Sequence, residues 1–273
     1  MFTYLNPTIR QRLMDEHKLV RINAEGTETT LDQTPQDGEL AINVLGPIPL
    51  PIDLDDVKIT TQWYASVRST ELNQVEELAR DLSRQGSQTS FAELASSMAV
   101  NSVLVIGDLA NATNPLVRVH SSCLTGDVFG SQRCECGPQF VSALDRINQD
   151  EQGGLVIYMS GHEGRGIGLW AKAATYLLQD SGENTYEANR SLGLPDDSRD
   201  FTDAGALLHY FVGKRPFRLL TNNPKKVDDL RAFGHTQVTA VKHVIGVNPW
   251  NRRYLSAKKD WGHELSEQDI SKT

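Results

Sequence analysis

The sequence has few cysteines, few aromatic residues and no long apolar run. Only 3 of its 273 residues are cysteine, and this odd number argues against a disulfide framework. No apolar segment approaches the roughly 18 residues that a membrane-spanning helix needs. The first residues, MFTYLNPTIRQRLMDEHKL, lack the basic start, apolar core and small-residue cleavage site of a signal peptide. We therefore expect a cytoplasmic protein with no membrane partner.

Positive charge is also in deficit, because 27 Lys and Arg residues stand against 35 Asp and Glu residues, a formal net charge of -8. Such a surface repels nucleic acid on average, so we expect no nucleic-acid partner. A polyanionic ligand would have to be bound by a local basic cluster. The length suits one large domain or two modest ones.

The N-terminal third of the sequence predicts a small α+β unit. Segment 45–51 (LGPIPLP) contains three prolines, which favour an ordered loop or an extended arm over a central strand. The β-branched and aromatic residues of 57–67 predict a strand. Residues 69–85 have helical spacing that ends before a glycine, and a capping box at 90–93 predicts a short helix that ends near residue 100.

From residue 101 onward, predicted strands and helices alternate, which is typical of an α/β domain. Strands are predicted at 102–109, 115–121, 154–159, 216–221 and 238–247. Helices are predicted at 139–149, 167–179, 201–212 and 224–233, and from residue 251 into the tail. We therefore expect two domains, an N-terminal extension over 1–100 and a larger domain over 101–273.

The three cysteines, Cys123, Cys134 and Cys136, lie close together in a polar stretch. Thiolates suit zinc, and three protein ligands with an open position are typical of a catalytic zinc site, which lowers the pKa of water to about 7. The Cys-x-Cys pair is tighter than a usual zinc knuckle, so three buried structural cysteines are the alternative. His120 is a candidate fourth ligand, although a supporting role is more typical of such a histidine.

Five segments carry a resemblance to a known family. They are RVHSSCLTGDVFGSQRCECGPQ (118–139), EGRGIGL (163–169), TYLLQD (175–180), LGLPDDSRDF (192–201) and LLTNNPKK (219–226). Together they closely resemble the signature of GTP cyclohydrolase II, in that family's order and over about residues 102–267. The resemblance implies an α/β catalytic domain of GTP cyclohydrolase II type, with a mixed α+β sheet, over 101–273. Residues 1–100 then form a small α+β extension that the short bacterial enzymes lack.

The family resemblance also implies an activity and a set of site residues. The family hydrolyses the five-membered ring of guanine in GTP, releasing formate and pyrophosphate, as the first committed step of riboflavin synthesis. Zinc (Zn²⁺) is implied as cofactor with Cys123, Cys134 and Cys136 as ligands, Mg²⁺ is expected with the triphosphate, and a homodimer is the family default. Tyr176 matches a residue that assists proton transfer, Asp197 the proton acceptor, and Arg199 the residue proposed to attack the α-phosphate. The implied nucleotide contacts are Arg118, Val119, His120, Ser121, Ser122, Gln139, Glu163, Gly164, Arg165, Thr185, Thr221 and Lys226.

These residues suit that chemistry, although each is open to a plainer interpretation. The basic residues that could neutralise a triphosphate are Arg118, Arg165, Arg199, Lys225 and Lys226. A proline at the first turn of the helix over 224–233 would place Thr221 near a helix N-terminus, where phosphate binds favourably. Taken alone, the two lysines would be a solvated helix face, Tyr176 a core residue and Asp197 part of a turn. Because a guanidinium stays protonated, Arg199 suits an electrostatic role better than a nucleophilic one.

The sequence departs from the family pattern beside the site. One extra residue precedes Glu163, His162 stands where the family has glutamine, and Ser122 replaces the family's glutamate before Cys123. A changed polar side chain beside the nucleotide alters which edge of the base can find hydrogen-bond partners. A related branch of uracil catabolism also carries an N-terminal extension, so opening the ring of a uridine nucleotide (UMP or UTP) is the alternative to GTP. A non-catalytic nucleotide-binding paralogue is a third interpretation, although no zinc ligand is missing.

Overall fold

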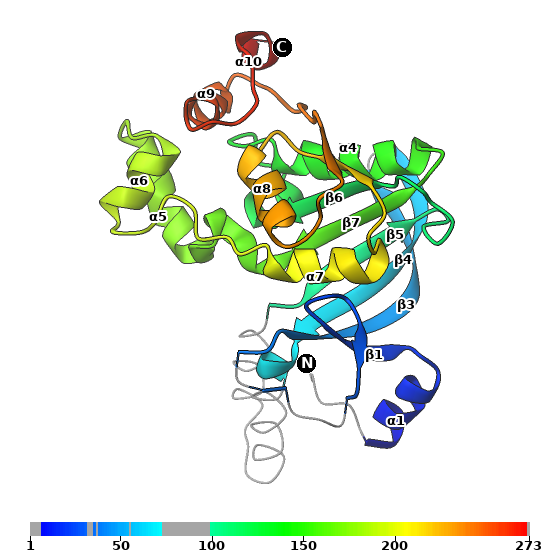
Figure 1. The fold of residues 1–273 in the computed structure, drawn as a ribbon. Helices are drawn as coiled ribbons and strands as arrows, with labels where there is room; N and C mark the ends of the chain where they lie inside the picture. Colours follow the sequence, from blue (N-terminus) through cyan, green and yellow to red (C-terminus); the bar gives the residue numbers. More distant parts are fainter. Residues whose placement is uncertain (1–6, 32–34, 37, 55, 73–98, 272–273) are drawn as a thin grey trace.

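A computed structural model describes residues 7–31, 35–36, 38–54, 56–72 and 99–271 (Figure 1). In this part of the chain, one mixed sheet has the strand order β2-β1-β3-β4-β5-β7-β6-β8-β9. The strands are β1 (Leu19–Asn23), β2 (Glu28–Thr29), β3 (Ala41–Leu54), β4 (Val57–Arg68), β5 (Asn101–Ile106), β6 (Leu116–Ser121), β7 (Gly154–Met159), β8 (Phe217–Leu220) and β9 (Val238–Val241). The helices are α1 (Pro7–Asp15), η1 (Leu124–Val128), α4 (Cys136–Gln149), η2 (Ser160–Arg165), α5 (Gly168–Asp180), α6 (Thr185–Ser191), α7 (Thr202–Phe211), α8 (Pro224–Ala232), α9 (Arg252–Asp260) and α10 (Glu267–Ser271).

The direction of the strands changes across the sheet. Strands β7, β6, β8 and β9 are parallel to one another, whereas β1, β3, β4, β5 and β7 pair antiparallel in turn. The carboxyl ends of β7, β6 and β8 therefore meet at one edge of the sheet. In open α/β sheets this edge is where ligands bind.

The N-terminal strands belong to the same sheet as the rest of the chain. Strand β4 pairs with β5 from Gln62 opposite Val105 to Ser66 opposite Asn101. The mixed α/β sheet of the prediction is confirmed. The division into domains at residue 100 stays a prediction. Hydrogen bonds between β4 and β5 join strands from the two sides of that position.

The proline-rich segment 45–51 is a paired strand, so the expectation of a loop or an arm was wrong. It lies within β3, which pairs with β4 from Ile48 opposite Trp63 to Leu54 opposite Val57. Strand β1 pairs with β3 only up to Leu45. The prolines at 47, 49 and 51 therefore lie where one side of β3 has no neighbouring strand among the residues that the structure describes, which is the position a sheet allows for proline.

Side chains alternate between the two faces of the sheet and form two apolar clusters. In β7, Leu155 and Ile157 belong to the cluster that includes residues of α7, whereas Val156 belongs to the cluster with Leu144 of α4. Helices α7 and α4 thus cover opposite faces, as Figure 1 shows. Burying both faces is expected for parallel strands with near-continuous apolar sequences.

Most elements predicted after residue 100 are confirmed within a few residues. The strand predicted at 238–247 ends earlier, at Val241, and α6 was missed although Asn184 and Glu187 form a capping box at its start. The helix predicted over 69–85 begins in the described residues 69–72, and the rest of it and the helix predicted to end near residue 100 lie largely outside the described residues. None of the helices that the structure describes is long and apolar enough to cross a membrane.

Candidate active site

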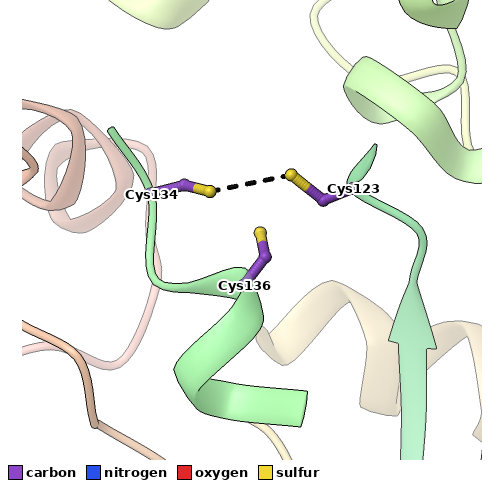
Figure 2. Close-up of side chains that lie close together, drawn as sticks. All are labelled: Cys123, Cys134 and Cys136. Carbon is purple, nitrogen blue, oxygen red and sulfur yellow. Dashed lines mark hydrogen bonds between the residues drawn. The ribbon is translucent and has the colours of Figure 1, made fainter. Parts of the chain in front are cut away.

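The three cysteines converge at the carboxyl edge of the sheet (Figure 2). Cys123 follows β6, Cys134 lies in the loop before α4, and Cys136 is the first residue of that helix. Their sulfur atoms all lie within 4.8 Å of one another, with 3.6 Å between those of Cys123 and Cys134. Among the described residues, this is the cluster of side chains that could hold a metal ion.

The backbone around the sulfur atoms is shaped to leave them close together. A Cβ atom on Gly126 would lie 3.0 Å from the sulfur of Cys134 and 3.1 Å from that of Cys123. A Cβ atom on Gly137 would lie 2.4 Å from the carbonyl oxygen of Gly126. The cysteines are free thiols, so three soft ligands face one point, and this donor set fits zinc with an open position.

The candidate fourth ligand, His120, is engaged elsewhere. Its Nε2 atom lies 3.1 Å from Asp127 Oδ2, which also accepts hydrogen bonds from the Tyr158 hydroxyl and the Cys123 backbone N–H. Burial lowers the pKa of His120, so the ring is neutral. Asp127 thereby holds both the histidine and the loop that begins at Cys123, which is the supporting role expected for a histidine beside a metal site.

Lys172 of α5 is the charged partner of the cysteine cluster. Its ammonium group donates hydrogen bonds to Cys123 Sγ (3.1 Å), Glu163 Oε1 (2.6 Å) and Thr125 Oγ1 (3.0 Å). Burial opposes the charge, but the Glu163 hydrogen bond and the Cys123 charge prevail and raise the pKa of Lys172. Hydrogen bonds from Cys134 and Cys136, with Lys172 nearby, lower the pKa of Cys123. A thiolate, the form that binds metal, is therefore favoured at Cys123.

Tyr176 stands one helical turn after Lys172 and lines the pocket above the cysteines. Its hydroxyl lies 3.2 Å from Thr125 Oγ1, and the guanidinium carbon of Arg133 lies 4.4 Å from its ring centre. Burial raises the pKa of Tyr176, so the phenol keeps its proton at neutral pH. Tyr176 is therefore a wall residue of the pocket and not the core residue of the plainer interpretation.

The loop after β7 carries Glu163, Gly164 and Arg165 into the same pocket. Glu163 accepts hydrogen bonds from the backbone N–H groups of Leu124 (2.7 Å) and Gly164 (3.1 Å), which fixes the loop against the cysteine loop. Arg165 has φ 67°, a left-handed backbone conformation that is unusual for a residue other than glycine. Such strained positions gather at functional sites.

Arg165 presents a buried guanidinium whose two terminal nitrogens are not hydrogen-bonded within the described part of the chain. The residue is 9% exposed, and neither Nη1 nor Nη2 has a partner among the described residues. Its guanidinium carbon lies 3.9 Å from the ring centre of Tyr186. Because an unsatisfied buried charged group is costly, this arginine is suited to receive an anionic ligand.

A second, cationic pocket adjoins the first. The residues that line both are Ser121, Cys136, Arg165, Arg199 and Tyr254. Arg118 and Lys226 line only the second pocket, and both are buried, with burial lowering the pKa of Arg118 to about 10. Lys226 donates to the carbonyl oxygen of Val119 (2.8 Å), and Arg118 donates to Gln139 Oε1 (2.8 Å).

Arg199 lies where the two pockets meet and is held by Asp197. Two hydrogen bonds join the Arg199 guanidinium to the carboxylate, from Nε to Oδ1 (2.9 Å) and from Nη2 to Oδ2 (2.5 Å), and the Arg199 backbone N–H also donates to Oδ1 (3.1 Å). Burial raises the pKa of Asp197, but the hydrogen bonds from Arg199 outweigh it and leave the pKa lowered. Asp197 is thus ionised and orients the guanidinium, although it does not itself line either pocket.

The remaining predicted contacts fall into two groups. Those that line a pocket are His120, Ser121, Ser122, Gln139, Glu163, Gly164, Thr185 and Thr221. Val119 does not line either pocket, because its side chain is fully buried in the sheet. It contacts the site through its backbone carbonyl, which accepts a hydrogen bond from Lys226.

Lys225, a candidate phosphate ligand, instead pairs with Asp229 (2.6 Å) on the outer face of α8. The helix N-terminus is as predicted, with Asn223 as the capping residue and a proline at the first turn.

His162, which stands in place of the family's glutamine, has both ring nitrogens satisfied within the protein. Nε2 donates to the carbonyl oxygen of Asp200 (2.9 Å), and Nδ1 therefore accepts from the Ser121 hydroxyl (3.2 Å). Arg199 in turn donates to the same hydroxyl (3.3 Å). In this arrangement His162 supports Arg199 through Ser121, and it offers no free nitrogen to a base.

Lys172, Tyr254 and Lys258 line the pockets but were missed from the sequence. Lys172 stands four residues before Tyr176, and this i, i+4 spacing could have placed the two on one helix face. Tyr254 and Lys258 have the same spacing in the tail, where no motif drew attention to them.

Comparison with known proteins agrees with this geometry. The family model described as GTP cyclohydrolase II matches residues 88–242, which is more than half of the chain. The chain belongs to the GTP cyclohydrolase II family. The match covers all three cysteines, the loop after β7 that carries Glu163, and the N-terminus of α8.

Curated relatives match about three fifths of the chain. Proteins named "Riboflavin biosynthesis protein RibBA" are 49% identical over 168 residues in Salinispora arenicola and 52% identical over 163 residues in Nocardia farcinica. These matches cover 61% and 59% of this chain, but only 40% and 39% of the relatives. The chain therefore spans about two fifths of the length of the relatives that it matches.

Proposed function

We propose that the chain is a zinc-dependent cyclohydrolase that opens the five-membered ring of the guanine in GTP and releases formate and pyrophosphate. The observation that carries this proposal is the junction of two pockets, one with three cysteine sulfur atoms and one with buried cations, which share Arg165 and Arg199. A nucleoside triphosphate has two matching ends, a base to be hydrolysed and a chain of phosphates. Membership of the GTP cyclohydrolase II family and relatives named for riboflavin biosynthesis support guanine as the base.

Cys123, Cys134 and Cys136 would hold the zinc ion, which when bound supplies Lewis acidity and an activated water at neutral pH. Around it, the chain's own residues handle protons and orientation. Tyr176, whose phenol is protonated, can donate a proton to a ring nitrogen, and Thr125 links it to the ammonium of Lys172. Glu163 holds Lys172 and the cysteine loop in one arrangement.

The cationic pocket would bind the triphosphate. Arg118, Arg165, Arg199 and Lys226 face it, together with the N-terminus of α8 at Thr221 and Asn223. Arg199, oriented by Asp197, is suited to stabilise the charge that develops on the phosphate from which pyrophosphate leaves. Mg²⁺ accompanying the triphosphate is part of the same proposal.

No observation favours the uridine alternative. One of the departures that raised it, His162, has both nitrogens bonded within the protein. The relatives reported above are named for riboflavin biosynthesis and not for uracil catabolism. GTP is therefore the substrate of this proposal, acting in a cytoplasmic enzyme.

A homodimer belongs to the proposal as well. Large apolar side chains are exposed at the end of η1 and on α5, with exposed fractions of 70% for Phe129, which follows η1, 91% for Trp170 and 71% for Leu177. The Thr125–Tyr176 hydrogen bond holds these two elements together. Exposed apolar groups of this kind mark interaction surfaces, and we place the contact with a second copy there.

The experiment that tests the activity follows formate and the pyrimidine product. Zinc-loaded protein incubated with GTP should release formate, pyrophosphate and a 2,5-diamino-pyrimidinone identified by mass and absorbance. Cys134→Ser should lose bound zinc and formate release together. Absence of formate from GTP with zinc-loaded protein would refute the proposed activity, and unchanged zinc in the variant would refute the metal assignment.

A further inference from the structure

Helix α9 contributes side chains to the active-site pockets although it lies beyond the region matched by the family model. Tyr254 of α9 lines both pockets, Lys258 of α9 lines the cationic one, and so does His263, which follows the helix. The family match ends at residue 242. In Figure 1, α9 and α10 lie beyond the edge of the sheet, on the side of α8 and α4.

Lys258 reaches the pocket wall through an ion pair with Glu135, the residue between Cys134 and Cys136. The side chains are 17% and 4% exposed, and Lys258 Nζ contacts Glu135 Oε1. The other carboxylate oxygen, Oε2, has no partner among the described residues. The lysine also lies over Tyr254, with Nζ 4.9 Å from the ring centre. An ammonium group has three donors, so Lys258 retains capacity for a further acceptor.

The pocket that Lys258 faces has an excess of positive charge. Its basic lining residues are Arg118, Arg165, Arg199, Lys226 and Lys258. Glu135 is the carboxylate among the lining residues, and the nearby Asp197 is already bound twice by Arg199. The cations are close enough that, after burial, the charges of Arg118, Arg199 and Lys258 lower the pKa of Lys226. In a chain of net charge -8, this local excess is suited to a polyanion.

We propose that Lys258 of α9 is a binding residue for the phosphate chain of the substrate, and that it exchanges Glu135 for phosphate oxygens when the substrate binds. The identity of the substrate as a nucleoside triphosphate rests on the proposed function, whereas the polyphosphate site rests on the charges described above. Lysine binds phosphate as a mobile point charge, which suits such an exchange. The C-terminal segment would then complete the pocket.

The test compares two neighbouring lysines in the zinc-loaded chain of residues 1–273. Lys258→Met removes the ammonium group from the pocket, whereas Lys259→Met removes one that pairs with Glu267 outside it. Inorganic tripolyphosphate, GTP and guanosine are titrated by calorimetry. We expect Lys258→Met to lower the affinity for tripolyphosphate and for GTP about tenfold or more, as loss of a charge-assisted contact does. The affinity for guanosine should stay unchanged. Lys259→Met should match the unmodified chain.

Two results would overturn the proposal: unchanged tripolyphosphate binding in Lys258→Met, or an equal loss for tripolyphosphate and guanosine, which would mark a purely structural tie. Should Lys258→Met fail to fold, Glu135→Gln provides the second test. This substitution removes the carboxylate that pairs with Lys258, so we expect tripolyphosphate to bind severalfold more tightly. Weaker or unchanged binding would count against the exchange of Glu135 for phosphate. Because tripolyphosphate has no base, these results are distinct from formate release, which tests the proposed activity.

Discussion

The ammonium group of Lys172 lies 3.1 Å from the sulfur of Cys123 and 2.6 Å from a carboxylate oxygen of Glu163. A zinc dication bound by three thiolates carries one net negative charge. In a buried site that charge needs a counter-charge, and Lys172, only 7% exposed, is in place to supply it. Under the proposed zinc site, we therefore expect Lys172 to support metal binding.

Replacing Lys172 with methionine is expected to weaken zinc binding. Loss of a group that supports a metal ligand lowers metal affinity by about 10–100-fold. Competition with a chromophoric chelator measures this directly, without reference to turnover. Lys214→Met, on an exposed position, is the control and should retain the original affinity. Equal affinity in the two variants would contradict the role of Lys172.

Arg199→Lys is expected to lower turnover of GTP by roughly 100-fold, the scale seen when one oriented electrostatic group is lost. A lysine cannot make the paired bonds to Asp197 and also reach Ser121, as Arg199 does. Zinc content should stay unchanged, which separates this effect from loss of the metal. Arg190→Lys, which alters a surface pair with Asp196, should have little effect. Equal turnover in both variants would argue against the assignment.

The stability of the chain is expected to fall as the pH drops from about 7 to 5, in part through His162. Burial lowers its pKa to about 4, below the value of about 6.5 in an unfolded chain. Between these values the unfolded state binds more protons, so the stabilisation is present above the unfolded pKa and is lost as the pH falls. His162→Gln should remove up to about 2 kcal/mol of this pH dependence.

Urea unfolding at pH 7 and pH 5 measures the contribution of His162. The exposed His17 provides the control, because His17→Gln should leave the difference between the two pH values as it was. An unchanged pH dependence in His162→Gln would show that the buried ring is not held neutral. His243 and His263, whose pKa values burial lowers to about 4 and about 3, should account for part of the remainder.

The proposed dimer contact is tested by charging its most exposed residue. Trp170→Glu is expected to shift the molar mass found by light scattering from two copies toward one, because a carboxylate in an apolar interface costs several kcal/mol. Trp250, also exposed but outside η1 and α5, is the matched control as Trp250→Glu. A mass that stays at two copies in Trp170→Glu would place the interface elsewhere.

Much of the candidate site could be predicted from the sequence because its residues are clustered in short segments. Cys123, Cys134 and Cys136 lie on one loop and the helix that follows, so their convergence needs few long-range contacts. The loop at Glu163 and the N-terminus of α8 each follow a parallel strand, and parallel strands bring their carboxyl ends to one edge. The α/β alternation that predicts such strands was itself visible in the pattern of apolar residues.

The remainder depends on tertiary contacts that leave no local pattern. Lys258 reaches Glu135 across 123 residues of sequence, and nothing near either residue indicates the pair. The prolines of β3 argue against a central strand in the sequence, but β1 pairs with β3 only up to Leu45, so within the described residues they lie on an unpaired side of the strand. His162 looked like a changed base contact, and only its bonds to Ser121 and Asp200 show it as a support.

Whether the chain opens the ring of GTP is tested most directly by presenting the zinc-loaded protein with GTP and UTP in equal amounts. We expect GTP to disappear, with one formate and one pyrophosphate formed for each GTP consumed, while UTP stays intact. Consumption of UTP with GTP left unchanged, or no formate from GTP in protein that retains its zinc, would contradict this expectation.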